Sequence, residues 1–163
     1  MSAMVDAFSW VQAAGVTVAA ALLAAALVHV YWALGGKLAI LAAIPERDGR
    51  AIFRPRAWPT AAVAVALAAC AFLALLVSGW LAPNWLATHV PRWLIVVPAW
   101  AVALVFALRA VGDFRYVGFA KRIRGSRFAR LDDFCYAPLC ACIAMALGFV
   151  LLAGHAAGAL PAF

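Results

Sequence analysis

The stretch that decides the fold runs from Ala7 to Gly36, AFSWVQAAGVTVAAALLAAALVHVYWALGG, and contains no charged residue. A helix crosses the hydrocarbon core of a membrane with about 20 apolar residues, so this stretch is long enough to span it. The residues before it include Asp6 but no basic segment, and the apolar part is too long for the core of a cleavable signal peptide. We therefore expect a transmembrane helix over 13–34 that stays in the protein.

Three further apolar stretches follow, over 57–91, 93–112 (broken only by Arg109) and 134–163. Hydrophobic residues make up 69 % of the 163 positions and charged residues 12 %. An ordinary soluble domain is about half apolar and a quarter charged, so this composition excludes that class. The sequence predicts an all-α membrane protein, one domain over 1–163, folded as an antiparallel bundle of four transmembrane helices. The further spans are predicted over 59–81, 93–112 and 135–160.

The basic residues predict the orientation of the bundle. Twelve of the 13 Lys and Arg residues lie between the first two spans or at and after the end of the third, and only Arg92 lies on the other side. Basic loops stay in the cytoplasm, so we expect both termini on the non-cytoplasmic side. The formal net charge of +7 then follows from topology and from attraction to anionic membrane lipids, without a nucleic-acid partner.

Polar residues near the cytoplasmic ends of the spans are the candidates for a site, because polar groups in a membrane are costly. His29 lies about 7 Å inside the end of the first span. Arg109 and Asp113 are one helical turn apart and can form an ion pair. Asp132, Asp133 and Tyr136 begin the fourth span at the same level. We expect these groups to converge on one polar pocket, whose ligand-binding residues are predicted to be His29, Tyr31, Trp32, Lys37, Arg109, Asp113, Arg115 and Tyr116.

This pocket is predicted to bind a small anionic or amphipathic ligand, such as a lipid headgroup. Arginine suits phosphate and carboxylate because its planar fork binds them bidentately. Arg109, Arg115 and Lys37 would contact the anion, His29 and Tyr31 would add hydrogen bonds, and Asp113 would orient the arginines.

Other interpretations of the same residues stay open. The cluster could be structural, with Asp113 paired to Arg109 or Arg115 and His29 bonded to a carbonyl or a tyrosine. The protein could instead be an enzyme for a lipid or isoprenoid substrate, with His29 as acid–base and Asp113 as its orienter. A third alternative is a structural subunit of a larger complex. Whether the chain is an enzyme, and whether it forms a homo-oligomer, the sequence leaves open.

No metal ion or cofactor is predicted. His155 lies about 30 Å from the cytoplasmic face, so His29 and His155 are in opposite leaflets and cannot hold one haem iron. Cys140 and Cys142 point about 200° apart around a helix. A zinc site needs at least three convergent protein ligands, and the sequence offers none here.

The two cytoplasmic loops are each predicted to hold a short interfacial helix, over 38–44 and 114–123, where apolar and basic residues alternate. Both loops later combine glycine, arginine and phenylalanine, at 49–54 and at 125–130, so the two hairpins could be an internal repeat. Shared topology explains the likeness equally well. Alanine-rich spans predict close packing of the first two helices, because small residues let membrane helices approach.

Two motifs resemble those of a bacterial family of small four-helix membrane proteins known only as a domain of unknown function. The first is HVYWALGG over 29–36, and the second is GDFRYVGF over 112–119. The segment RFARLD over 127–132 fits the same pattern. The resemblance covers nearly the whole chain and implies a protein of the bacterial inner membrane, without implying an activity.

Overall fold

The computed structural model describes residues 2–47, 50–52, 55–81 and 89–156. Its long helices are α1 (Ser2–Ala33), α2 (Ala57–Val77), α4 (Trp93–Val111) and α6 (Ala137–Ala156), the last continuing from the short helix α5 (Arg127–Leu131) and the π turn η2 (Asp132–Tyr136). Four stretches are long and apolar enough to cross a membrane, over 9–33, 57–77, 93–111 and 127–154. The predicted fold class is confirmed, and the chain is a multi-pass membrane protein.

The fourth span begins at Arg127 rather than at the predicted residue 135. Ser126 caps its first turn, because the Ser126 hydroxyl accepts the N–H of Ala129 at 3.0 Å. Asp132 and Asp133, which follow, are paired with basic side chains, as described below, so they do not stop the helix. The predicted final residues of this span, 157–160, lie outside the described part of the chain.

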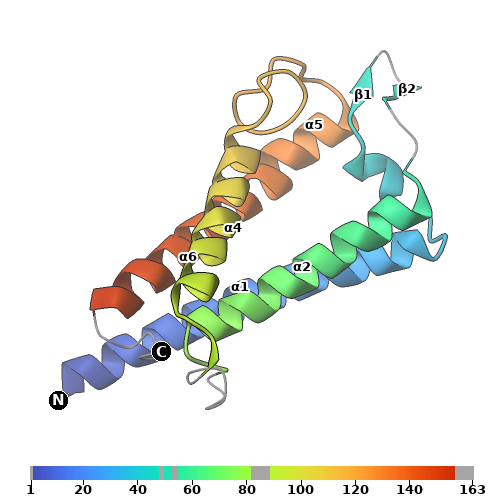
Figure 1. The fold of residues 1–163 in the computed structure, drawn as a ribbon. Coiled ribbons are helices and arrows are strands. Elements are labelled where there is room, and N and C mark those ends of the chain that lie inside the picture. Colours follow the sequence, from blue (N-terminus) through green and yellow to red (C-terminus); the bar gives the residue numbers. More distant parts are fainter. Residues whose placement is uncertain (1, 48–49, 53–54, 82–88, 157–163) are drawn as a thin grey trace.

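The bundle consists of two helical hairpins, α1 with α2 and α4 with α6 (Figure 1). Two apolar clusters join them, and each takes residues from all four long helices. Leu22 of α1, Ala71 of α2, Ala103 of α4 and Ile143 of α6 are the members closest to the loops after α1 and α4. Beyond them the two hairpins diverge towards the end that carries the β1–β2 ladder.

Small residues allow α1 and α2 to pack closely, as the alanine-rich sequence predicts. A Cβ added at Gly15 would lie 2.2 Å from Cβ of Ser78, so only glycine fits at this crossing. Ala19 and Ala26 of α1 and Ala64 and Ala71 of α2 are buried. In lipid, helices associate through such close contact rather than through the hydrophobic effect.

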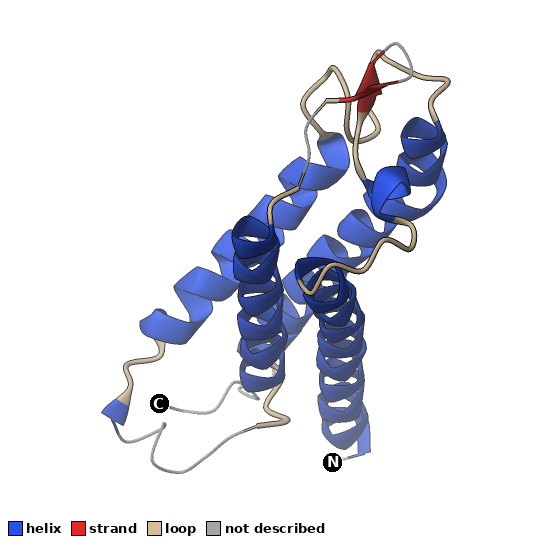
Figure 2. Cartoon of the chain, turned by 90° about the vertical axis from the view of Figure 1, so that its right-hand side faces the viewer, coloured by secondary structure: helices blue, strands red, loops and turns tan. Residues whose placement is uncertain are grey.

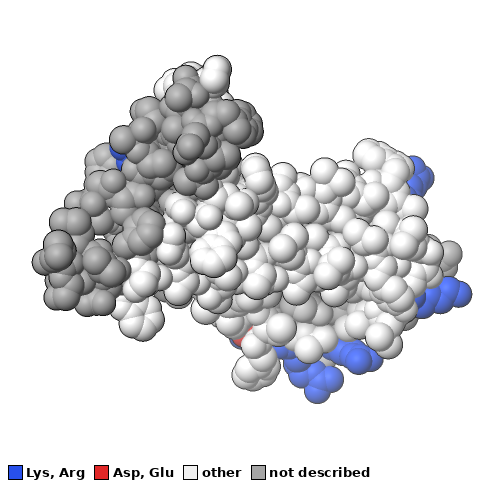
Figure 3. Space-filling model, turned by 90° about the horizontal axis from the view of Figure 1, so that it is seen from below, with Lys and Arg blue, Asp and Glu red and all other residues white. Residues whose placement is uncertain are grey.

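The segments 34–56 and 112–126 lie together at one end of the bundle, which we call the basic end (Figure 2). Within it, a 3-10 turn η1 (Ile40–Ala43) precedes the two-residue strands β1 (Glu46–Arg47) and β2 (Arg50–Ala51), which pair antiparallel. Figure 3 shows most of the Lys and Arg side chains gathered at this end, a small basic patch at the opposite end and a largely uncharged flank between them. The chain thus presents an apolar body with a charged end.

The structure contains only part of one of the two predicted interfacial helices. The first is reduced to the single turn η1, and the second is wrong, since residues 112–126 contain no helix. Gly112, with φ of +95°, turns the chain away from the axis of α4, and backbone hydrogen bonds to side chains then fix a compact loop. The glycine–arginine–phenylalanine segment over 49–54 lies partly outside the described residues.

Candidate functional site

The first motif, over 29–36, ends helix α1 and folds the chain back over it. Gly35 has φ of +94°, and the N–H of Gly36 donates to the Tyr31 carbonyl at 2.9 Å, which is the Schellman pattern of a helix end. The Trp32 Nε1–H donates to the Leu38 carbonyl at 2.9 Å, and the Tyr31 hydroxyl accepts the Leu38 N–H at 3.3 Å. Tyr31 and Trp32 therefore hold the following segment against the end of α1.

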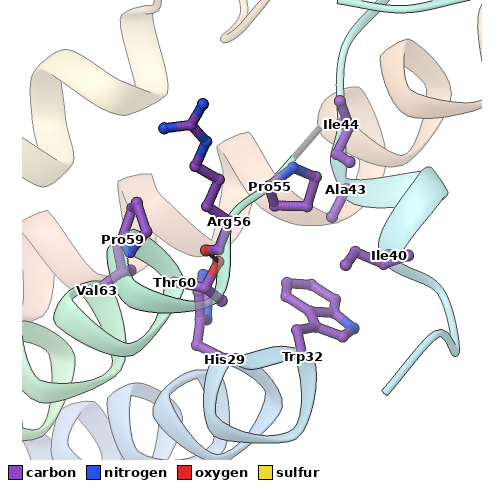
Figure 4. Close-up of a pocket in the computed structure, with 10 residues that line it drawn as sticks. All are labelled: His29, Trp32, Ile40, Ala43, Ile44, Pro55, Arg56, Pro59, Thr60 and Val63. Carbon is purple, nitrogen blue, oxygen red and sulfur yellow. Dashed lines mark hydrogen bonds between the residues drawn. The ribbon is translucent and has the colours of Figure 1, made fainter. Parts of the chain in front are cut away.

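This turn encloses a cavity of about 390 Å³ between α1, the η1 segment and the start of α2 (Figure 4). His29 and Trp32 rise from α1, with their ring centroids 5.1 Å apart. The cavity continues the buried faces of both helices, because His29 follows Ala26 and Thr60 precedes Ala64 by about one turn. Its lining residues are His29, Trp32, Ile40, Ala43, Ile44, Pro55, Arg56, Pro59, Thr60 and Val63.

The polar groups of this pocket are few and well oriented. His29 Nδ1 lies 2.8 Å from the Ala25 carbonyl oxygen, and the Thr60 hydroxyl donates to the Arg56 carbonyl at 2.8 Å. The guanidinium of Arg56 extends away from His29. The structural interpretation left a carbonyl or a tyrosine as the partner of His29, and the structure shows the Ala25 carbonyl in that place. Asp113 does not orient the imidazole, so the acid–base dyad of the enzyme interpretation is not formed.

A second polar cluster, which we call the Asp132 network, lies between α4, the loop after it and η2. The side chains of Asp132 and Lys121 have exposed fractions of 0 %. Asp132 accepts from Arg109 Nη2 at 2.9 Å, from Lys121 Nζ at 3.0 Å and from the Gly118 N–H at 2.6 Å. Lys121 also bonds Asp133 at 2.5 Å. A buried carboxylate between two cations satisfies the requirement that charges be paired when they leave water.

The second motif, over 112–119, shapes the loop that completes this network. The backbones of Gly112 and Gly118 cross so closely that a Cβ at Gly112 would lie 1.7 Å from the Val117 carbonyl oxygen. The N–H groups of Phe119 and Ala120 donate to the last carbonyls of α4, those of Ala110 and Val111, at 2.8 and 3.0 Å. The loop thereby satisfies carbonyls that a helix end leaves without partners.

Asp113 is not paired with an arginine side chain in the structure, so that prediction is wrong. Its Oδ1 accepts the N–H groups of Arg115, Tyr116 and Val117 at 2.9, 2.7 and 3.0 Å. Desolvation raises the pKa of the Asp113 carboxyl, but these N–H groups outweigh it and hold the pKa below its ordinary value. The physical reason for the error is that α4 ends at Val111, so Asp113 does not share a helix face with Arg109.

The predicted site residues therefore divide into separate groups. His29 and Trp32 line the pocket, and Arg109 belongs to the Asp132 network. Tyr31 does not line the pocket, but its hydroxyl accepts the Leu38 N–H and so holds the segment after α1 in place. The others, none of which lines the pocket, are the exposed Lys37, Asp113 and Arg115 and the partly exposed Tyr116, whose ring lies 5.2 Å from the Arg115 guanidinium carbon. Ligand binding by these residues stays a prediction.

Sequence reasoning missed Lys121, Thr60 and Arg56. Lys121 stands among arginines in a loop without periodicity, so nothing in its neighbourhood marks it as buried. A signal existed in Asp132 and Asp133, two acids at the start of a span that need cationic partners. Thr60 is a single hydroxyl in an apolar helix, where it commonly bonds the carbonyl one turn earlier.

Among the residues that the structure describes, no three His, Cys, Asp or Glu side chains gather as a metal site would require. A family model described as "Protein of unknown function (DUF3995)" matches residues 22–147. This match covers the whole pocket and the whole Asp132 network. No curated protein and no solved structure matches the chain.

Proposed function

Because the chain belongs to the DUF3995 family, proteins of unknown function, we propose its function from the pocket: it binds an amphipathic molecule with an anionic headgroup at the basic end of the bundle. The apolar part of the ligand lies between α1, η1 and α2, and the anionic part lies at Arg56. The observation that carries this proposal is the cavity itself, with its apolar walls and the basic side chain of Arg56 in its lining.

The size and the walls of the cavity suit such a ligand. Ligand sites commonly measure about 300–1,000 Å³ and combine apolar walls with a few placed polar groups. Here the walls are the indole of Trp32 and the side chains of Ile40, Ala43, Ile44, Pro55, Pro59 and Val63, whereas the polar groups come from His29, Arg56 and Thr60. A wholly charged small anion would leave most of these walls in contact with water.

The charge around the cavity favours an anionic headgroup. Arg56 is an exposed cation in the lining, and none of the lining residues that the structure describes is acidic. The first turn of α2 also lacks acidic side chains, and its N-cap makes no side-chain hydrogen bond. The N-terminus of a helix attracts negative charge, so it adds to the attraction by Arg56.

The level of the pocket also supports an amphipathic ligand. His29 lies four residues before the end of α1, and Thr60 lies three residues after the start of α2, both inside candidate membrane spans. At about 1.5 Å per residue these side chains lie about 5–6 Å inside the helix ends. This depth corresponds to the boundary between headgroups and acyl chains, from which a lipid-like molecule can enter.

The proposal is tested with dodecyl phosphate added to the protein purified in a neutral detergent. Native mass spectrometry measures the dissociation constant of the bound phosphate. Ala43→Phe fills the cavity and is expected to abolish binding, whereas Ala120→Phe, at an exposed position in the other loop of the basic end, is expected to leave binding unchanged.

A second pair of variants tests the role of charge. Arg56→Gln is expected to weaken binding about ten- to a hundredfold, because a hydrogen bond to a charged group contributes about 1.5–3 kcal/mol. Arg122→Gln removes the same charge from an exposed position at the same end and is expected to have little effect. Equal losses of affinity in both variants, or binding that survives Ala43→Phe, would contradict the proposal. Either result would favour the interpretation as a structural subunit.

A further inference from the structure

We propose that the pocket selects an amphiphile whose headgroup carries a hydroxyl group beside the anionic group, and that His29 and Thr60 accept the hydrogen of that hydroxyl. This inference rests on the proposed function and narrows its ligand class to polyol phosphates bearing one apolar chain, of which a monoacyl glycerol phosphate is the simplest form.

The first observation is the state of the His29 ring. Its Nδ1 lies 2.8 Å from the Ala25 carbonyl oxygen, which can only accept a hydrogen bond. Nδ1 must therefore carry the hydrogen, and in the neutral imidazole Nε2 is then an acceptor. The remaining contact of the ring within the described residues is the edge contact with Trp32. Nε2 thus offers a lone pair without a partner in the part of the chain that the structure describes.

The second observation is the state of Thr60. Its hydroxyl hydrogen is used in the 2.8 Å bond to the Arg56 carbonyl, so the Thr60 oxygen is also left as an acceptor. Thr60 of α2 and His29 of α1 both line the cavity (Figure 4). Two helices therefore contribute one acceptor each, and both donors have been consumed by backbone carbonyls of their own helices.

These acceptors decide which headgroup atoms fit between them. A phosphate or carboxylate oxygen placed there would meet lone pairs only, and its charge would lose water without gaining a hydrogen bond. An ammonium group could donate, but Arg56 in the same lining would repel it, and no acidic residue of the lining would compensate its charge. A neutral hydroxyl supplies the donor without adding charge, which leaves the anionic group for Arg56.

The experiment compares two ligands that differ by one hydroxyl. They are 1-lauroyl-glycerol 3-phosphate and its deoxy analogue, 3-lauroyloxypropyl phosphate, each titrated in the same detergent and buffer. The wild-type protein is expected to bind the hydroxylated ligand about two- to tenfold more tightly, which is the usual range for one net hydrogen bond.

Variants assign this preference to its two acceptors. His29→Phe and Thr60→Val each replace a polar side chain by an apolar one of similar size, so each is expected to reduce the preference for the hydroxylated ligand. The double variant is expected to bind both ligands equally. Arg56→Gln is expected to weaken the binding of both ligands by the same factor and to keep the preference, because it changes only the contact with the anionic group. His29→Gln retains an acceptor and is expected to keep part of the preference.

The outcomes separate this inference from the proposed function. If the wild-type protein binds both ligands equally, and Ala43→Phe still abolishes binding, the hydroxyl inference fails and the pocket remains a site for amphipathic anions. If neither ligand binds, both proposals fail. A preference that survives in the double variant would show that other groups recognise the hydroxyl, and it would overturn the roles of His29 and Thr60.

Discussion

Gly112 and Gly118 are the residues on which the loop after α4 depends. Both have positive φ, +95° and +80°, and their backbones lie in contact. A residue with a Cβ is strained at such φ, and here the Cβ would also overlap backbone atoms that cannot move independently. The glycines of the second motif are thus explained by packing, without reference to a ligand.

Gly118→Ala is expected to destabilise the protein clearly more than Gly125→Ala. Gly125 also has positive φ, +108°, but nothing lies within 4 Å of a Cβ added there, so only the backbone strain of about 1–2 kcal/mol applies. At Gly118 the same Cβ would lie 2.4 Å from Cα of Gly112. Thermal unfolding in detergent measures the difference, and equal melting temperatures would contradict the crossing of the two backbones.

Asp113 stabilises the same loop, because its carboxylate accepts hydrogen bonds from three successive N–H groups. Asp113→Ala is expected to lower the melting temperature, whereas Asp113→Asn, which keeps an acceptor oxygen, is expected to lower it less. The carboxyl pKa is below its ordinary value of 3.8 in the folded protein, so its contribution to stability is present above that pH.

This contribution is lost as the pH falls below 3.8 and passes through the folded pKa. The difference in melting temperature between the wild-type protein and Asp113→Asn should therefore shrink in that window. It is expected to be small at every pH, because the group is largely exposed to solvent. If the difference in melting temperature grew on acidification, it would contradict a carboxylate whose ionised form is stabilised by N–H donors.

At the scale of elements, the Asp132 network fixes how the loop after α4 meets the fourth span. Asp132 begins the π turn η2, and single π turns inside helices often occur where a side chain must be positioned. The carboxylate joins α4 through Arg109 and the loop through Lys121 and Gly118. Helix α4, the loop after it and η2 thus share one buried carboxylate.

Asp132→Ala is expected to cost about 3–5 kcal/mol of stability, because Arg109 would lose its carboxylate partner and the buried Lys121 would keep only Asp133. The double variant Lys121→Met/Asp132→Leu is expected to recover much of this loss, since well-packed apolar residues can replace a buried ion pair. Chemical or thermal unfolding in detergent measures both variants. A double variant as unstable as the single one would show that Lys121 is not the group left uncompensated.

At the scale of the whole molecule, apolar contact joins the two hairpins in the middle and at the end opposite the basic end. At the basic end the described contacts between them are fewer, and one is the 3.5 Å hydrogen bond from the Tyr136 hydroxyl to the Ala42 carbonyl. The pocket belongs to one hairpin, α1 with α2, and the Asp132 network to the other. Each hairpin therefore builds its own polar centre.

The orientation of the bundle is a prediction from charge. A phosphatase reporter fused after Phe163 is expected to be active, because it would lie outside the cytoplasm, and one fused after Arg124 is expected to be silent. The physical reason is that segments rich in Lys and Arg are retained in the cytoplasm during insertion. The reverse pattern of activity would place the basic end, with its pocket, on the other side of the membrane.

The sequence alone determined the class of the protein, its four spans and the gathering of charge at one end. These properties follow from local composition, because a long apolar stretch must leave water whatever its neighbours are. It also placed His29 inside the first span and left a carbonyl or a tyrosine as its partner in the structural interpretation.

Only the tertiary structure decided how the polar residues combine. Arg109 faces Asp132 rather than Asp113, and Lys121 is buried while its neighbour Arg122 is exposed. Such pairings depend on where α4 ends and on which helix faces meet, and neither is encoded in the spacing along one helix. The pocket has the same origin, because His29 and Thr60 come within reach of one ligand only where α1, α2 and the turn after α1 pack together.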